Sequence, residues 1–120
     1  MKNPITDEHI AAFELAIAHW QRELGLMDWR IVRGDRPAKQ AMADMQIDPS
    51  AKLAVWRIGK TWGSEKITAQ SISATACHEL IHVLLCELTT AVEYKAAAEI
   101  IDGAEHRVIN TLERLLVPQP

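Results

Sequence analysis

The stretch CHELIHVLL, residues 77–85, places two histidines and a glutamate inside an otherwise apolar run. It belongs to a segment from about Thr68 or Ser71 to Leu88 that predicts a helix. His78 and His82 are four residues apart, so a helix carries both side chains on one face, with about 6 Å of axial rise between them. Both imidazoles can therefore reach one metal ion.

Glu79 lies beside this pair, about 100° around the helix from His78. From there a carboxylate can hold and deprotonate a metal-bound water without itself being a ligand, as in the HExxH pattern, present here as HELIH. Apolar residues at 81 and 83–85 predict that the polar groups are largely buried. Buried polar groups without partners cost about 1–3 kcal/mol each, which favours a metal site over an amphipathic helix with partly exposed histidines.

A zinc site that performs catalysis typically has three protein ligands, so a third ligand must come from elsewhere in the chain. Cys86 is about 12 Å along the helix from His78, too far for one tetrahedral ion, and is typical of a small core residue. The segment IIDGAEHRVINTLERLL, residues 100–116, offers better candidates within a predicted last helix.

Glu105 fills the gap in an apolar stripe along that last helix. The stripe is formed by Ile101, Val108, Leu112 and Leu115. A carboxylate embedded in such a face needs a charged partner, which is either zinc or an arginine in a structural salt bridge. The weaker alternatives are His106, rotated about 100° toward solvent, Asp102, or no third ligand from the chain.

The rest of the chain predicts a single α+β domain, residues 1–120. Thr6 caps a helix from 6 to 24, and a short strand follows around Trp29 to Val32. Residues 41–48 alternate between apolar and polar and predict a strand whose hairpin partner is residues 52–59. A loop at 59–66 precedes the motif helix, and a last helix from about 94 to 117, after an ambiguous stretch at 89–98, ends before Pro118.

Composition narrows the classes of partner. A chain of 120 residues with 48% hydrophobic content can bury a core without disulfides, and its net charge of −3 gives no basic footprint for nucleic acid or membrane. No signal peptide or membrane span is visible in the sequence. Cys77 and Cys86, nine apart on one helix, are poorly placed for a disulfide, so we expect a cytoplasmic (intracellular) protein.

HELIH and, more weakly, AEHRVINTLERLL at 104–116 resemble the zincin metallopeptidases, in particular the gluzincin pattern of HExxH followed by a glutamate on a later helix. The element order is similar to the minimal, phage- or prophage-encoded type and to the broader SprT-like group. The resemblance implies a minimal zincin-like fold with His78 and His82 as zinc ligands, Glu79 as general base and Glu105 as third ligand. No further histidine follows soon after His82, so the third histidine of SprT-like proteins is absent.

The resemblance also implies that a protein or peptide substrate pairs with an edge strand over the cleft, for which we nominate residues 53–58. Tyr94 and His106 are the candidate oxyanion stabilisers. Three of the four tryptophans are expected in the core, whereas Trp62 could line the cleft. The rival function is a zinc-stabilised interaction or assembly module without turnover, but Glu79 favours an enzyme because a structural site needs no base.

Overall fold

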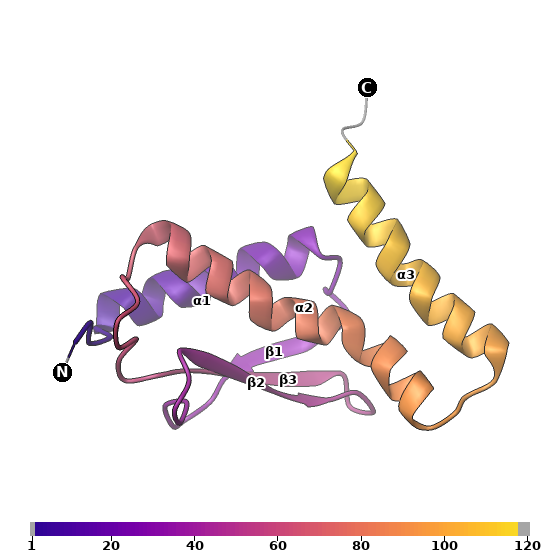
Figure 1. Ribbon diagram of the computed structural model, residues 1–120, viewed down its shortest axis with the longest axis horizontal. Coiled ribbons are helices and arrows are strands. Elements are labelled where there is room, and N and C mark those ends of the chain that lie inside the picture. The colour runs from indigo at the N-terminus through magenta and orange to yellow at the C-terminus, as the bar shows by residue number, and fades with distance from the viewer. Residues whose placement is uncertain (1, 118–120) are drawn as a thin grey trace.

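The computed structural model describes residues 2–117 and shows three helices and a small three-stranded sheet (Figure 1). In chain order the elements are α1 (Asp7–Glu23), β1 (Arg30–Arg33), β2 (Ala43–Asp48), β3 (Leu53–Ile58), α2 (Ala69–Glu93) and α3 (Ala98–Leu116). The predicted α+β class, with one helix before the sheet and two after it, is confirmed. Pro118, the predicted stop of the last helix, lies outside the described residues.

α1 precedes the sheet in the chain and α2 follows it, and each helix has a threonine as its N-cap. The Thr6 hydroxyl accepts a hydrogen bond from the His9 backbone N–H (3.3 Å), and His9 Nδ1 accepts one from the Thr6 N–H (3.1 Å). Thr68 and Ser71 exchange the same pair of bonds at the start of α2. Because the first N–H groups of a helix lack intrahelical partners, these bonds fix both starts close to where the sequence predicts them.

The sheet has the order β1-β3-β2, so β3 is its central strand. β2 and β3 form the predicted antiparallel hairpin, with Asp44 opposite Arg57. β1 pairs in parallel with the other edge of β3, where Ile31 lies opposite Ala54. The nomination of residues 53–58 as the edge strand is therefore wrong, because the backbone of β1 occupies the side of β3 that an isolated hairpin would leave free.

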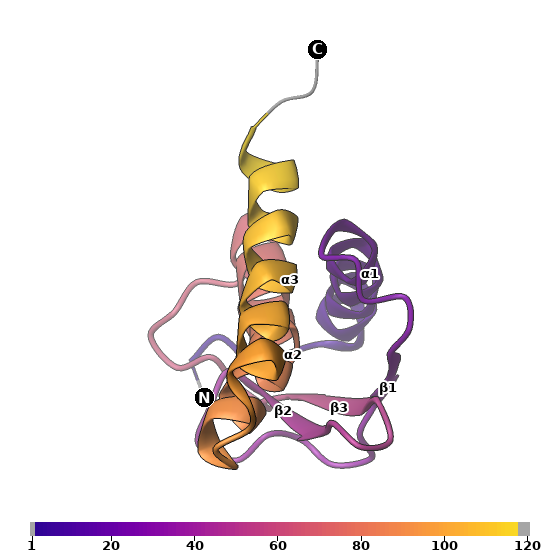
Figure 2. The same ribbon diagram turned by 90° about the vertical axis from the view of Figure 1, so that its right-hand side faces the viewer.

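Both α1 and α2 cover one face of the sheet (Figure 2). Alternate residues of β3 turn toward the helices, and Trp56 is buried there with its ring centroid 5.2 Å from that of Phe13. From α2, Ala76, Leu80 and Val83 enter the same core. The sheet thus packs on α2 along the part of the helix that carries the HELIH motif.

The helix that carries the motif is longer than predicted. α2 continues past Leu88 to Glu93 and ends at Tyr94, and Lys95 has a left-handed backbone (φ 53°) that reverses the chain. Ala91 is buried near that end. The ambiguous stretch 89–98 therefore divides between the end of α2 and a short connection, and α3 begins later than the predicted residue 94.

The predicted apolar stripe of α3 is partly correct, because Ile101, Val108 and Leu115 are buried or half-buried. The rest of the inward face is shifted around the helix. Ala104, Val108 and Thr111 are buried or half-buried, whereas Glu105 and Leu112 are exposed. The inward face thus follows Ala104 and Thr111 rather than 105 and 112. In Figure 1 α3 leaves the C-terminal end of α2 at an angle, and its last turns project beyond the other helices.

Candidate metal centre

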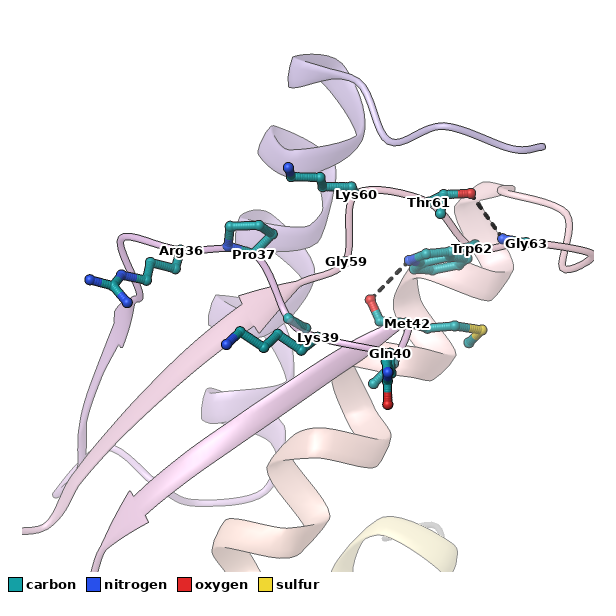
Figure 3. Close-up of a pocket in the computed structure, with 12 residues that line it drawn as sticks. Arg36, Pro37, Lys39, Gln40, Met42, Gly59, Lys60, Thr61, Trp62 and Gly63 are labelled. Atoms are coloured by element: carbon teal, nitrogen blue, oxygen red, sulfur yellow. Dashed lines mark hydrogen bonds between the residues drawn. The ribbon is translucent and has the colours of Figure 1, made fainter. Parts of the chain in front are cut away.

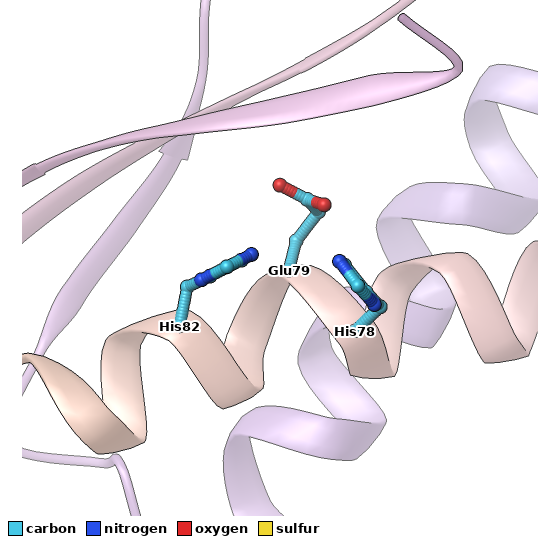
Figure 4. Close-up of side chains that lie close together, drawn as sticks. All are labelled: His78, Glu79 and His82. Carbon is cyan, nitrogen blue, oxygen red and sulfur yellow. The ribbon is translucent and has the colours of Figure 1, made fainter.

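His78, Glu79 and His82 form a compact group on α2. Their ligand atoms all lie within 4.8 Å of one another, and among residues 2–117 they make the one group of at least three such side chains that could hold a metal ion. Figure 4 shows the three side chains on one side of the helix, with the Glu79 carboxylate between the two rings and directed toward the sheet. The helical spacing of the motif is sufficient to produce this arrangement.

Glu79 is the buried member of the group, with 7% of its surface exposed. Burial raises the pKa of its carboxyl, the nearby charge of Asp44 raises that pKa further, and the charges of His82 and His78 oppose both effects. Within the described part of the chain the carboxylate takes part in no hydrogen bond or ion pair. No fully buried side-chain oxygen or nitrogen of the described residues lacks a partner, so the Glu79 oxygens keep some contact with solvent at the cleft. A cation held by the adjacent imidazoles would stabilise the charged form of this carboxyl.

The two histidines are exposed, contrary to the expectation that the whole polar group is buried. The reason is the position of each residue around α2. Glu79 lies on the same face of α2 as Ala76 and Leu80, which pack toward the sheet. His78 and His82 are about 100° and 60° around the helix from Glu79, at the rim of that face. The rings are therefore accessible to an ion from solvent, while the carboxylate is sheltered.

A cleft of 370 Å³ opens beside this group. It is lined by Met42, Ala43, Ala74, Thr75, His78 and Glu79. The sequence did not predict that Met42 and Ala43 line this cleft, because their position depends on which strand lies at the sheet edge over α2. The cleft therefore joins His78 and Glu79 to the start of β2.

The outer edge of β2 has unpaired peptide groups next to this cleft. The Gly59 N–H donates to the Met42 carbonyl (2.8 Å), so this pair is hydrogen-bonded across the hairpin. Bonded and non-bonded pairs alternate along an antiparallel ladder, which turns the peptide groups of Ala43 and Met45 away from β3. No strand of the described residues lies beyond β2, so these groups are free to bind an extended chain.

The structure does not bring Glu105 to the two histidines. Its side chain is exposed on α3, so the expectation that it is embedded in the apolar face is wrong. α3 approaches α2 on the side of Cys77 and Ile81, which line a cavity together with Leu112 and Leu115. That side is about 60–140° around α2 from the histidines. The role of Glu105 as third ligand remains a prediction that this packing does not support.

The other candidates from the last two helices are also outside the group. His106 is exposed and its Nδ1 lies 2.8 Å from the Asp102 carbonyl oxygen; this contact and the Asp102 charge raise the pKa of the imidazole. Tyr94 is 77% exposed at the end of α2, about 18 Å along the helix from His82. Neither is placed to stabilise an oxyanion beside Glu79. Cys86 is a buried free thiol, as predicted.

Three of the four tryptophans pack as predicted, and Trp62 does not line the cleft. Trp29 and Trp56 are in the core, and Trp20 is half-buried with its indole N–H donated to the Ser73 hydroxyl. Trp62 is buried at 3% exposure and donates its indole N–H to the Met42 carbonyl (3.0 Å). It therefore supports the residue at the mouth of the cleft rather than lining the cleft itself.

No protein-family model, curated protein or solved structure matches this chain. The resemblance to metallopeptidases thus depends on the motif and its surroundings. Among the described residues, no helix has the length and apolar character needed to cross a membrane.

Proposed function

We propose that the protein is a zinc-dependent peptidase in which His78 and His82 bind the metal and Glu79 is the general base. The observation that carries this proposal is the position of Glu79, a residue that is only 7% exposed and has a carboxylate oxygen within 4.8 Å of a ring nitrogen of each histidine. Within the described chain this carboxylate has no hydrogen-bond partner, and its oxygens open to solvent at the cleft. A carboxylate at this position does not stabilise the helix or its packing. A metal-dependent hydrolase, in contrast, requires a general base beside the metal.

The two imidazoles fit zinc as two of the three protein ligands that a catalytic site typically has, and the described residues place only Glu79 beside them. Imidazole nitrogen is a preferred zinc ligand, and two histidines one turn apart on a helix are a common zinc-binding pair. When bound, zinc supplies a positive charge that lowers the pKa of a coordinated water and polarises the carbonyl of the scissile peptide bond. The exposed rings leave room on the solvent side for water and substrate.

Glu79 supplies the acid–base chemistry. Its carboxylate accepts a proton from the attacking water and later donates that proton to the leaving amine. A pKa raised by burial suits both steps, because the group is then a stronger base and can hold the proton between them. The low polarity around the carboxylate also strengthens its interaction with a bound cation.

The substrate is a peptide segment in extended conformation along β2. Ala43 and Met45 offer outward peptide groups to it, and Ala43 lines the cleft beside His78 and Glu79. Main-chain pairing with an edge strand positions a peptide without requiring a particular side chain. This assignment replaces the central strand β3 by β2 as the strand that pairs with substrate.

The test is metal analysis followed by a cleavage assay. We expect about one zinc ion per purified chain and cleavage of unfolded casein that stops with 1,10-phenanthroline and returns with added zinc. Cleavage that is insensitive to the chelator and unchanged in His78→Ala would overturn the proposal. Zinc at one ion per chain with no cleavage of any unfolded protein would instead support the module without turnover.

A further inference from the structure

A second cavity, of 650 Å³, adjoins the cleft (Figure 3). It lies between the segment that enters β2 and the segment that leaves β3, residues 36–42 and 59–63. Met42 lines both this cavity and the cleft that contains His78 and Glu79. The two hollows therefore adjoin at Met42.

The wall of this cavity is held in place by its backbone. The Met42 carbonyl accepts hydrogen bonds from both the Gly59 N–H (2.8 Å) and the Trp62 indole (3.0 Å). A Cβ at residue 59 would lie 2.4 Å from the Ala41 carbonyl oxygen, so the close approach of the two segments requires glycine. The backbone N–H of Trp62 also donates to the Asn3 carbonyl (3.0 Å). These contacts fix the shape of the cavity wall.

Its lining is apolar inside and cationic at the rim. Trp62 and Ala38 are buried, and Met42 is half-buried. The rim carries three exposed cations, Arg36, Lys39 and Lys60, and none of them has an ion-pair partner in the described part of the chain. Figure 3 shows their charged ends on the side away from Trp62 and Met42.

This local charge is opposite in sign to that of the whole chain, which has a net charge of −3. Unpaired cations around an apolar hollow attract a ligand that combines an apolar group with carboxylates. Nucleic acid fits less well, because Trp62 is buried and offers no open ring face on which a base could stack.

We propose that the cavity bounded by residues 36–42 and 59–63 is a specificity subsite that selects peptide segments with an apolar side chain next to acidic residues. The inference rests on the proposed peptidase function and names the class of substrate. An extended peptide advances about 3.3 Å per residue. A chain paired with β2 that continues past Met42 therefore carries its following side chains over the cavity.

The test compares two fluorescein-labelled peptides of equal length, with the same apolar residues separated by Asp and Glu in one and by Lys in the other. Anisotropy is measured with the zinc-loaded full chain carrying Glu79→Gln, so that binding is seen without cleavage. We expect the acidic peptide to bind at least about tenfold more tightly. Adding Lys39→Glu and Lys60→Glu is expected to abolish or reverse that preference.

Arg30→Glu with Lys95→Glu is the matched control, because it changes the net charge equally at exposed positions outside the cavity. Equal binding of the two peptides, or the same loss in the control, would overturn the subsite. A labelled single-stranded oligonucleotide that binds more tightly than the acidic peptide would also overturn it.

The two proposals fail separately. Casein cleavage with no peptide preference leaves the peptidase and removes the subsite. Preference for the acidic peptide, lost on Lys39→Glu with Lys60→Glu, in a protein that cleaves nothing keeps the subsite and removes the catalytic assignment.

Discussion

The rings of His78 and His82 have centroids 5.1 Å apart and planes inclined at 78°, one helical turn apart on α2. Neither ring takes part in a hydrogen bond or ion pair within residues 2–117, so no protein contact competes for its nitrogens. The geometry is local to one helix, and it should survive changes elsewhere in the molecule. This independence makes the histidines the first target for mutation.

His78→Ala or His82→Ala should each lower zinc affinity by more than about 100-fold, because removal of a ligand exceeds the 10–100-fold loss typical of an outer partner. Isothermal titration of zinc into the metal-free protein measures the change. His106→Ala is the matched control, since that ring is exposed and paired with Asp102 on α3. Equal losses in all three variants would contradict the assignment.

Glu105→Ala should retain zinc at the wild-type stoichiometry, because the side chain is exposed and lies outside the ligand group. The measurement is metal content after dialysis. Loss of zinc in this variant would restore the sequence-based assignment of Glu105 as third ligand and would require α3 to pack differently against α2.

Glu79→Gln should keep zinc and reduce hydrolysis by about 10²–10⁴-fold, the usual contribution of a general base. The amide preserves the size of the side chain but cannot take a proton. Glu93→Gln, at an exposed position on the same helix, is the control. If Glu79→Gln releases zinc, the carboxylate is a ligand, and if it cleaves casein at the wild-type rate, it is not the base.

The same variant tests the electrostatics of the metal-free protein. Burial raises the pKa of Glu79 in the folded state, so the folded protein binds this proton more tightly than the unfolded chain does. The stabilisation is then complete below the unfolded pKa and is lost as pH rises through the raised folded pKa. Relative to Glu79→Gln, the wild type should become less stable as pH rises.

Urea unfolding of both proteins across that pH range, with chelator present, measures the difference. His78 and His82 are present in both proteins, so the comparison removes much of their own contribution to the difference. A difference that is constant with pH, or that grows in favour of the wild type as pH rises, would show that burial does not control this carboxyl.

The motif and the fold class could be predicted because both depend on local patterns. A helix fixes the relation of His78, Glu79 and His82 once the segment is known to be helical. Alternation at 41–48 likewise identified β2 and its hairpin. The position of β2 at the edge could not be predicted, because it depends on the parallel pairing of β1 with β3 across residues far apart in sequence.

The rotation of α3 was mispredicted for a related reason. Two stripes with steps of three and four residues run along this helix, one through 105 and 112 and the other through 104 and 111. Because Leu112 is large and apolar, the sequence favoured the first stripe as the inward one. In the structure, Ala104 and Thr111 of the second stripe are half-buried. Arg107, which follows Ala104 by three residues and bonds to Glu87 of α2, belongs to the face that the structure turns inward.

The contacts of Arg107 give the last prediction. Its guanidinium lies 2.7 Å from Glu87 Oε1 and 3.4 Å from Asp28 Oδ1, and Asp28 also bonds to Lys52, which lowers the pKa of the Asp28 carboxyl. Arg107→Gln should reduce the free energy of unfolding by about 0.5–1 kcal/mol, since these groups are partly exposed and screened. The loss should shrink with added salt, and it should also shrink as pH falls through the lowered Asp28 pKa. Urea unfolding measures the change in the free energy of unfolding. A loss no larger than that of Arg30→Gln, the control at an exposed position, would mean that the ion pairs of Arg107 do not hold α3 in place.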